Sequence, residues 1–289
     1  MSAIQRVLFP IDLSSDCESL LPTVRKMIET WGAEVTLLHI VESRRWLRSK
    51  PEFGRLMAQM QEIAEGGLEA RHAVCRLESG APADRILQFV RANRIDLVVM
   101  TAGGPGSLAR NPLGSVADQV LAEAPCPVWL DWGSGRSRPE SGMFARHICC
   151  ALELDDSDEA VFGMATQFTA ELEAALTVVH AVLPPAGQQL RPWDRAVHNR
   201  ALAKARNRID TLRQRFFPAA EITVEVGLGH AVVSRSIQLQ NAGLLITPNR
   251  REAILAAEAE CPVLRLATLT SCAAQPIEVP LRYAAARSA

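Results

Sequence analysis

Glycine and serine residues lie between an apolar run and a helical pattern in the first half of the chain. Gly103 and Gly104 come first, and Gly114 and Ser115 stand directly before the periodic residues that begin at Val116. Glycine permits positive φ angles and close approach of the backbone. The N–H groups at a helix start attract anions. The interval therefore predicts either a phosphate site or a simple turn followed by a helix start.

Two further positions fall where a ligand of this kind would lie. Asp12 follows an apolar run at 7–11, and Val41 ends a second run at 35–41. Both runs have the pattern of buried parallel strands. In an open α/β sheet, ligands bind at the carboxyl ends of the strands. We therefore expect a phosphate at 104–115 and a base near Asp12 and Val41.

Apolar runs alternate with helical periodicity, and this alternation predicts the elements that position the site. Strands are expected at 7–11, 35–41, 73–77, 96–100 and 127–130, and helices at 20–28, 55–69, 82–90 and from 116 onward. Such alternation indicates right-handed βαβ crossovers and a parallel sheet.

The second half of the chain repeats the first. VLFPIDLSSD recurs as ICCALELDDS and VTLLHIV as LTVVHAV, both at an offset of 141 residues. DLVVMT recurs as AGLLIT at an offset of 146, but APCPVWL recurs as AECPVLRL at only 135. The second copy is thus expected to be eleven residues shorter across the glycine interval. A long-period repeat predicts two domains of one fold, at 1–136 and 144–268, followed by a tail at 269–289.

Composition argues against several classes of protein. The 289 residues carry a net charge of −1, with 48% hydrophobic and 22% charged residues, so nothing draws the chain to nucleic acid or a membrane. Pro10 and Asp12 interrupt the N-terminal segment too early for a signal peptide. We expect a cytoplasmic protein with reduced cysteines. No H-x-x-x-H or C-x-x-C spacing occurs, so no metal site is expected.

The segments FPID, HIVE, SGAPADRILQFVRANRIDLVVM, GSVADQVL and APCPV resemble the universal stress protein family across nearly all of the first copy. The second copy resembles the family more loosely, so the whole looks like a tandem-type member. The resemblance implies two five-stranded parallel α/β domains of the Rossmann-like, adenine nucleotide alpha hydrolase-like class. It also implies a pseudo-dimer, and the PVWL and PVLRL strands are the expected contact edges.

The resemblance also implies a ligand. Many family members bind ATP through G-x-x-G, nine residues, and then G-S or G-T. Gly104 matches, with Gly114 and Ser115 after nine residues, whereas Thr101 stands at the first glycine of the pattern. Asp12 matches an acid that contacts adenine or ribose, and Val41 matches a residue whose backbone holds the adenine edge. The expected cofactor-binding residues are Pro10, Asp12, Val41, Thr101, Gly104, Gly114, Ser115 and Val116.

The second copy departs from the pattern at the same points. Glu153 stands in place of Asp12 and Ala151 in place of Pro10, and no glycine follows Thr247 before the next strand. We therefore expect a single nucleotide site, in the first copy, with the second copy as its structural partner.

Two classes of function remain. The first is a universal stress protein that binds ATP, with Mg²⁺ as a candidate companion, and acts in the stress response by binding or signalling, with weak ATP hydrolysis at most. The second is an interaction protein that has kept the fold and lost the ligand, and so has no cofactor. No catalytic residue is assigned. Expected partners are an adenine nucleotide, further copies of the chain or a protein client, but neither nucleic acid nor a membrane.

Two residue sets have ordinary explanations that we prefer. His39 and His180 occupy equivalent strand positions, which favours shared packing over catalysis. The arginines between 191 and 215 favour a solvated helix face over a nucleic-acid surface, because the net charge is close to zero.

Overall fold

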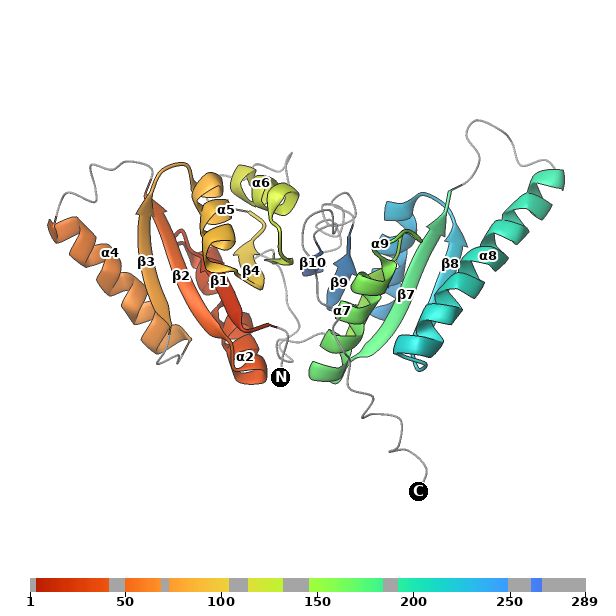
Figure 1. Ribbon diagram of the computed structural model, residues 1–289, viewed down its shortest axis with the longest axis horizontal. Helices are drawn as coiled ribbons and strands as arrows, with labels where there is room; N and C mark the ends of the chain where they lie inside the picture. The colour runs from red at the N-terminus through yellow and green to blue at the C-terminus, as the bar shows by residue number, and fades with distance from the viewer. Residues whose placement is uncertain are drawn as a thin grey trace, which may run out of the picture.

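The computed structural model describes residues 4–41, 50–68, 73–103, 114–131, 146–183, 192–248 and 261–266. Within these ranges, ten strands form one continuous sheet in the order β3-β2-β1-β4-β5-β10-β9-β6-β7-β8 (Figure 1). The strands are β1 (Arg6–Pro10), β2 (Glu34–Val41), β3 (Val74–Ser79), β4 (Leu97–Thr101), β5 (Val128–Asp131), β6 (His147–Ala151), β7 (Ala175–Val182), β8 (Glu221–Val226), β9 (Leu244–Thr247) and β10 (Val263–Arg265).

Helices cover both faces of the sheet. They are α1 (Ser15–Glu18), α2 (Leu21–Trp31), α4 (Lys50–Glu62) with a π-helical turn η1 (Ile63–Gly67), α5 (Pro82–Asn93), α6 (Ser115–Glu123), α7 (Asp158–Glu171), α8 (Pro192–Phe216) and α9 (Gly229–Gln240). One buried cluster joins the sheet to α2, α7 and α8, and a second joins its other face to α5, α6 and α9. This is the expected α/β architecture.

The two copies have the same strand order and meet edge to edge. Strands β3-β2-β1-β4-β5 are parallel, as are β8-β7-β6-β9-β10. Strands β5 and β10 pair antiparallel, with Leu130 opposite Val263 and Val128 opposite Arg265. Contact through the fifth strands is therefore confirmed, and the two sheets merge into one.

Strand pairing corrects one detail of the repeat. Val7 pairs with Leu97 in the first copy, and Ile148 pairs with Leu244 in the second. Val7 and Ile148 are 141 positions apart, as the repeat predicts. Leu97 and Leu244 are 147 positions apart, whereas the repeat of DLVVMT as AGLLIT predicts 146.

The counterpart of Thr247 is consequently Met100 and not Thr101. The second copy is twelve residues shorter across the glycine interval, because the next strands keep the offset of 135. Both fourth strands are buried on both faces, so their apolar runs carry no alternation that would fix the register from sequence.

Other limits also differ from expectation. The helix expected at 20–28 corresponds to α2 and is preceded by the short α1. The helix expected at 55–69 begins at Lys50 and ends in the wider π-helical turn η1. The expected domain limits and the tail lie outside the described residues, so they stay predictions.

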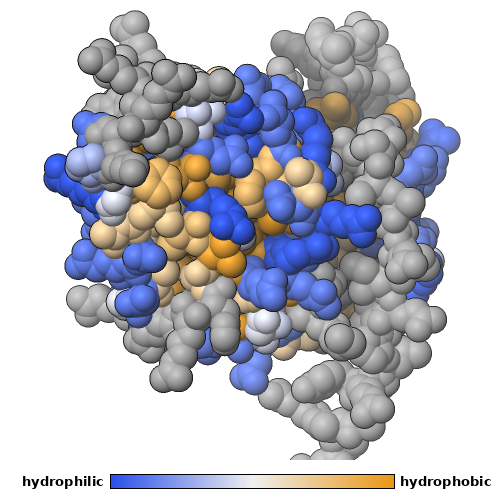
Figure 2. Space-filling view, turned by 60° about the vertical axis from the view of Figure 1, so that its left-hand side comes forward, coloured by the Kyte–Doolittle hydropathy of each residue, from blue (hydrophilic) through white to orange (hydrophobic). Residues whose placement is uncertain are grey.

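The outer edge of the first copy exposes apolar side chains. Phe53 of α4 and Val74 of β3 are 41% and 40% exposed, and Figure 2, in which this side comes forward, shows apolar residues gathered in a patch that hydrophilic residues cross. Strand β3 ends the sheet here and carries Arg76 and Glu78. Charges on an edge strand disfavour pairing with another sheet.

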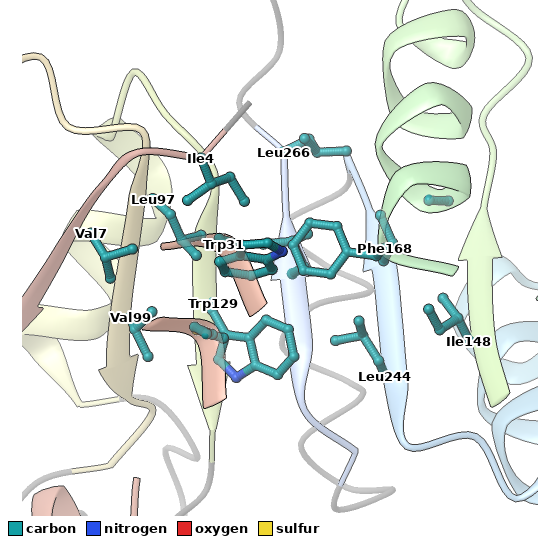
Figure 3. Close-up of a cluster of buried hydrophobic side chains, with 14 of the residues drawn as sticks. Ile4, Val7, Trp31, Leu97, Val99, Trp129, Ile148, Phe168, Leu244 and Leu266 are labelled. Atoms are coloured by element: carbon teal, nitrogen blue, oxygen red, sulfur yellow. The ribbon is translucent and has the colours of Figure 1, made fainter. Parts of the chain in front are cut away.

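Aromatic rings fill the seam between the copies. Phe168 of α7 packs edge-on against Trp31 of α2, with centroids 5.2 Å apart, and stacks on Trp129 of β5 at 6.2 Å (Figure 3). Phe168 is fully buried. The hydrophobic core therefore continues from one copy into the other, and the two halves share much of their stabilisation.

Candidate nucleotide site

The end of β1 presents an exposed carboxylate. Pro10 is the buried last residue of the strand, and Asp12 follows in the loop to α1. The Asp12 carboxylate accepts hydrogen bonds from the Ser14 backbone N–H at 2.9 Å and from its hydroxyl at 2.5 Å. Ser14 in turn caps α1 by accepting from the Cys17 N–H at 3.4 Å. These contacts hold Asp12 at the carboxyl edge of the sheet.

The protonation of this loop follows from the same contacts. Burial acts to raise the pKa of Asp12, but hydrogen bonds from Cys17 and Ser14 outweigh it, so the pKa lies below its usual value. Burial raises the pKa of the Cys17 thiol to about 12. At neutral pH, Asp12 is therefore an anionic acceptor beside a neutral thiol, suited to hydroxyl or amino groups of a ligand and not to its phosphates.

Leu13 adopts a left-handed backbone conformation, with φ of 62°. A non-glycine residue in this region is strained, and such strain often marks a functional site. Leu154, its counterpart in the second copy, has φ of 61°. Because both copies have the same turn, it belongs to the fold and not to ligand binding alone.

The fourth strand and α6 are brought together by a backbone hydrogen bond. The Gly114 N–H donates to the carbonyl of Ala102 at 2.8 Å, so both ends of the glycine interval lie at the carboxyl edge of β4. Gly114 is the N-cap of α6, and no side chain in the described part of the chain caps that end. Ser115 is exposed, and Val116 packs partly against the core. The start of α6 can thus offer backbone N–H groups to an anion.

Gly114 does not need a glycine's conformational freedom. Its φ of −64° and ψ of 152° are open to any residue. Of the two properties of glycine, positive φ and close approach of the backbone, only the second can apply at Gly114, so the case for glycine here depends on space for a ligand. Gly104 lies outside the described residues.

Thr101 lies at the same edge, but its side chain faces the other layer. It is the last residue of β4 and only 8% exposed. Side chains alternate along a strand. Leu97 and Val99 belong to the cluster under α2, whereas Met100 belongs to the cluster under α6. The Thr101 Cβ therefore points away from the layer that contains α6.

Val41 ends β2, the strand beyond β1. Its carbonyl accepts a hydrogen bond from the Gly80 N–H at 3.1 Å, and Val182 accepts one from Gly227 at 3.0 Å in the second copy. This contact is a feature of the fold that both copies share. Gly80 has φ of +138°, so glycine is required at this turn.

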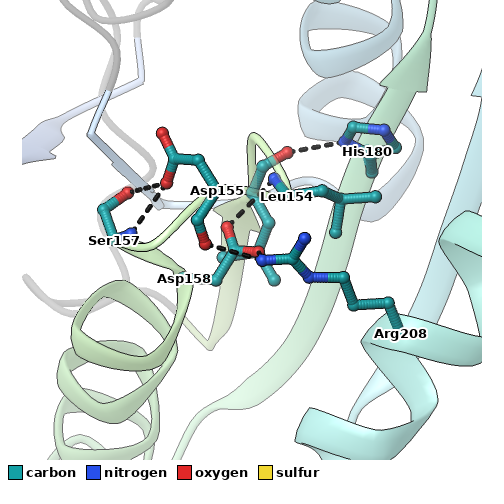
Figure 4. A network of polar contacts seen from close by, with 7 residues as sticks. Leu154, Asp155, Ser157, Asp158, His180 and Arg208 are labelled. Carbon is teal, nitrogen blue, oxygen red and sulfur yellow. Dashed lines mark hydrogen bonds and ion pairs between the residues drawn. The ribbon is translucent and has the colours of Figure 1, made fainter.

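The equivalent edge of the second copy carries an acid–arginine network (Figure 4). Asp158, 2% exposed, accepts from the Leu154 N–H at 3.0 Å and pairs with Arg208 of α8 at 3.4 Å. Arg208 also donates to the carbonyl of Asp155 at 2.8 Å. Burial raises the pKa of Asp158, and Arg208 opposes this shift. Arg208 thereby fastens α8 to the loop that follows β6.

This role of Arg208 was missed in the sequence. Part of the arginine-rich helix is a solvated face, but Arg208, Arg213 and Arg215 pair with acids. The available signal was Asp158, which stands where the first copy has Cys17. A buried acid, here at the first position of α7, requires a cationic partner or hydrogen-bond donors.

The two equivalent histidines are structural, as expected. Nδ1 of His39 lies 2.8 Å from the carbonyl oxygen of Ile11, and Nδ1 of His180 lies 2.7 Å from that of Leu152. Each histidine tethers the second strand of its copy to the end of the first. Among the described residues, no group of three or more histidine, cysteine or acidic side chains could hold a metal ion.

Comparisons with known proteins agree with this fold. A family model described as the universal stress protein family matches residues 3–130. A universal stress protein of Thermus aquaticus is 29% identical over 133 residues, which span 43% of this chain and 96% of that protein. A universal stress protein of Methanocaldococcus jannaschii is 26% identical over 136 residues, which span 43% of this chain and 79% of that protein.

Solved structures extend the likeness to both halves. A functionally unknown protein from Pseudomonas aeruginosa PAO1 matches with a TM-score of 0.66 at 18% identity, over 91% of this chain and 92% of its own. A universal stress protein from Archaeoglobus fulgidus DSM 4304 matches with a TM-score of 0.64 at 13% identity, over 90% of this chain and 97% of its own. At such identities the likeness shows the fold alone.

None of the helices in the described ranges is long and apolar enough to cross a membrane. The order of strands, the repeat and the family match over residues 3–130 lead to one conclusion. Residues 3–130 of the chain match the universal stress protein family, and the chain continues into a second domain of the same fold.

Proposed function

We propose that the first copy binds an adenine nucleotide, of which ATP is the leading candidate, and that the protein acts by binding or signalling and not by catalysis. The observation that carries the proposal is the hydrogen bond between Gly114 and Ala102, 2.8 Å long. It sets the start of α6, which no described side chain caps, at the carboxyl end of β4, next to the strand that ends before Asp12. A phosphate would bind at the helix start and the sugar or base near Asp12.

The second copy supports a single site. In the second copy, the loop equivalent to the Asp12 loop is held by the Asp158–Arg208 pair. The second copy is also twelve residues shorter across the glycine interval. Residues Pro10, Val41, Thr101, Gly104, Ser115 and Val116 remain proposed contacts.

An interaction protein without a ligand is the second candidate. Asp118 already places a negative charge in the first turn of α6, where it satisfies part of the helix dipole. Thr101 also replaces the first glycine of the family pattern.

The direct test is ATP binding by equilibrium dialysis with Asp12→Ala and its counterpart Glu153→Ala as the matched control. We expect Asp12→Ala to weaken binding by about tenfold, on the scale of a charged hydrogen bond, and Glu153→Ala to leave it unchanged. Mass spectrometry of protein purified without added nucleotide should detect the bound ligand. Wild-type protein that binds no ATP would favour the second candidate.

A further inference from the structure

Arg265 is a buried cation that the second copy directs into the first. It is the last residue of β10, lies opposite Val128 of β5 and is only 7% exposed. Its guanidinium donates a hydrogen bond to the carbonyl of Leu121 in α6. At the equivalent strand position the first copy has Leu130, an apolar residue. The contact is therefore specific to one direction across the seam.

The Leu121 carbonyl needs a partner from outside its helix. The amide that would complete its helical hydrogen bond belongs to position 125, which is a proline without an N–H group. Ala124 ends the helix in an extended conformation, and its own N–H bonds to Val120. A cation near the end of a helix also interacts favourably with the helix dipole. Arg265 meets both requirements at once.

The opposite end of α6 is the proposed phosphate site. The helix runs from Ser115 to Glu123, nine residues or about 13 Å, and Val120 and Leu121 are fully buried. A short helix with a packed face moves as a unit, so a contact that fixes its last turn also fixes the direction of its first N–H groups.

We infer that Arg265 is a positioning residue through which the second copy holds α6, and with it the phosphate-binding end of that helix, in the first copy. The inference rests on the proposed function for the identity of the ligand. It gives the second copy, which lacks the glycine interval, a definite part in binding at the first.

The test combines hydrogen exchange of residues 115–123 without nucleotide and ATP affinity by calorimetry, on the full chain. The variants are Arg265→Leu, Arg265→Lys and, as the matched control, Arg213→Leu. Arg213 also donates to a backbone carbonyl, that of Ala220 at 3.4 Å, but within the second copy. We expect Arg265→Leu to speed exchange in α6 by roughly tenfold to a hundredfold, the scale of a lost charged hydrogen bond.

Arg265→Lys keeps one donor and should show a smaller change, and Arg213→Leu should leave α6 exchange and ATP affinity as in the wild type. The loss of ATP affinity should follow the rise in the exchange rate of α6, being largest for Arg265→Leu, smaller for Arg265→Lys and absent for Arg213→Leu. Unchanged exchange in a folded Arg265→Leu variant would overturn the inference, as would faster exchange with unchanged ATP affinity. If Arg265→Leu does not fold, the lysine variant decides by the same criteria. Wild-type protein that binds no ATP defeats the proposed function, and exchange then decides separately whether Arg265 holds α6.

Discussion

Trp31 of α2 donates its indole N–H to the carboxylate of Glu171 in α7, a polar contact that joins the two copies inside an apolar seam. Gln167 donates to the other carboxylate oxygen at 2.9 Å. Burial raises the pKa of Glu171, and these two hydrogen bonds oppose the shift. The seam therefore contains a carboxylate that is paired by neutral donors rather than by a cation.

Replacing Glu171 by Gln should make the stability of the protein less dependent on pH. The folded-state pKa of Glu171 is raised, so this group favours folding below its unfolded pKa, and the advantage is lost as pH rises through the folded value. Glutamine can still accept from Trp31 but carries no charge. Urea denaturation should show Glu171→Gln gaining stability relative to wild type between about pH 4 and pH 7. If the difference in free energy of unfolding between the variant and the wild type stays constant across this pH range, the pKa of Glu171 is not raised in the folded protein.

Trp31→Phe should destabilise the protein by about 1–3 kcal/mol at pH 7, because the Glu171 carboxylate loses a buried donor. In the Glu171→Gln background the same change should have a smaller effect. A double-mutant cycle by urea denaturation measures the coupling between the two residues. Additive effects would mean that the hydrogen bond contributes nothing across the seam.

Phe168→Ala should lower the free energy of unfolding by about 3–5 kcal/mol, because the ring is fully buried against Trp31 and Trp129. Phe53→Ala is the control, since Phe53 is 41% exposed, and should change stability by less than about 1 kcal/mol. Both halves should unfold in one transition in the wild type. Similar losses for the two variants would contradict a shared core.

Arg208→Met should destabilise the protein by about 2–4 kcal/mol at pH 7, because it leaves the carboxylate of Asp158 buried without its cation. Arg215→Met is the control, because the pair between Arg215 and Glu159 is exposed on both sides and should contribute less than about 1 kcal/mol. Thermal unfolding compares the two variants. The loss in Arg208→Met should shrink at low pH, where Asp158 is protonated. Equal and small losses of stability in Arg208→Met and Arg215→Met would mean that Arg208 acts only as a surface charge.

The alternation of apolar runs and helical patterns predicted the parallel sheet, and the resemblance to the universal stress proteins implied contact through the fifth strands. The sequence could not show that Met100, and not Thr101, is the counterpart of Thr247. A strand buried on both faces has no alternation of apolar and polar residues that would fix its register. The sequence pattern also missed the partners of Asp158 and Glu171, since Arg208 and Trp31 lie far from them in the chain and only the folded sheet brings them together. The candidate site residues could be predicted because they stand at the expected ends of strands. The negative φ of Gly114 could come only from the structure.

The most direct test of the proposed site is the stoichiometry of ATP binding, measured by titration calorimetry on wild type, Gly114→Ala and Gly114→Val. The backbone of Gly114 accepts any residue, so both variants should fold with nearly wild-type melting temperatures. We expect one ATP per chain for the wild type, weaker binding for alanine and none for valine, because the added carbon atoms occupy the place of the phosphate. Two ATP per chain, or unchanged affinity in Gly114→Val, would contradict a single site at the start of α6.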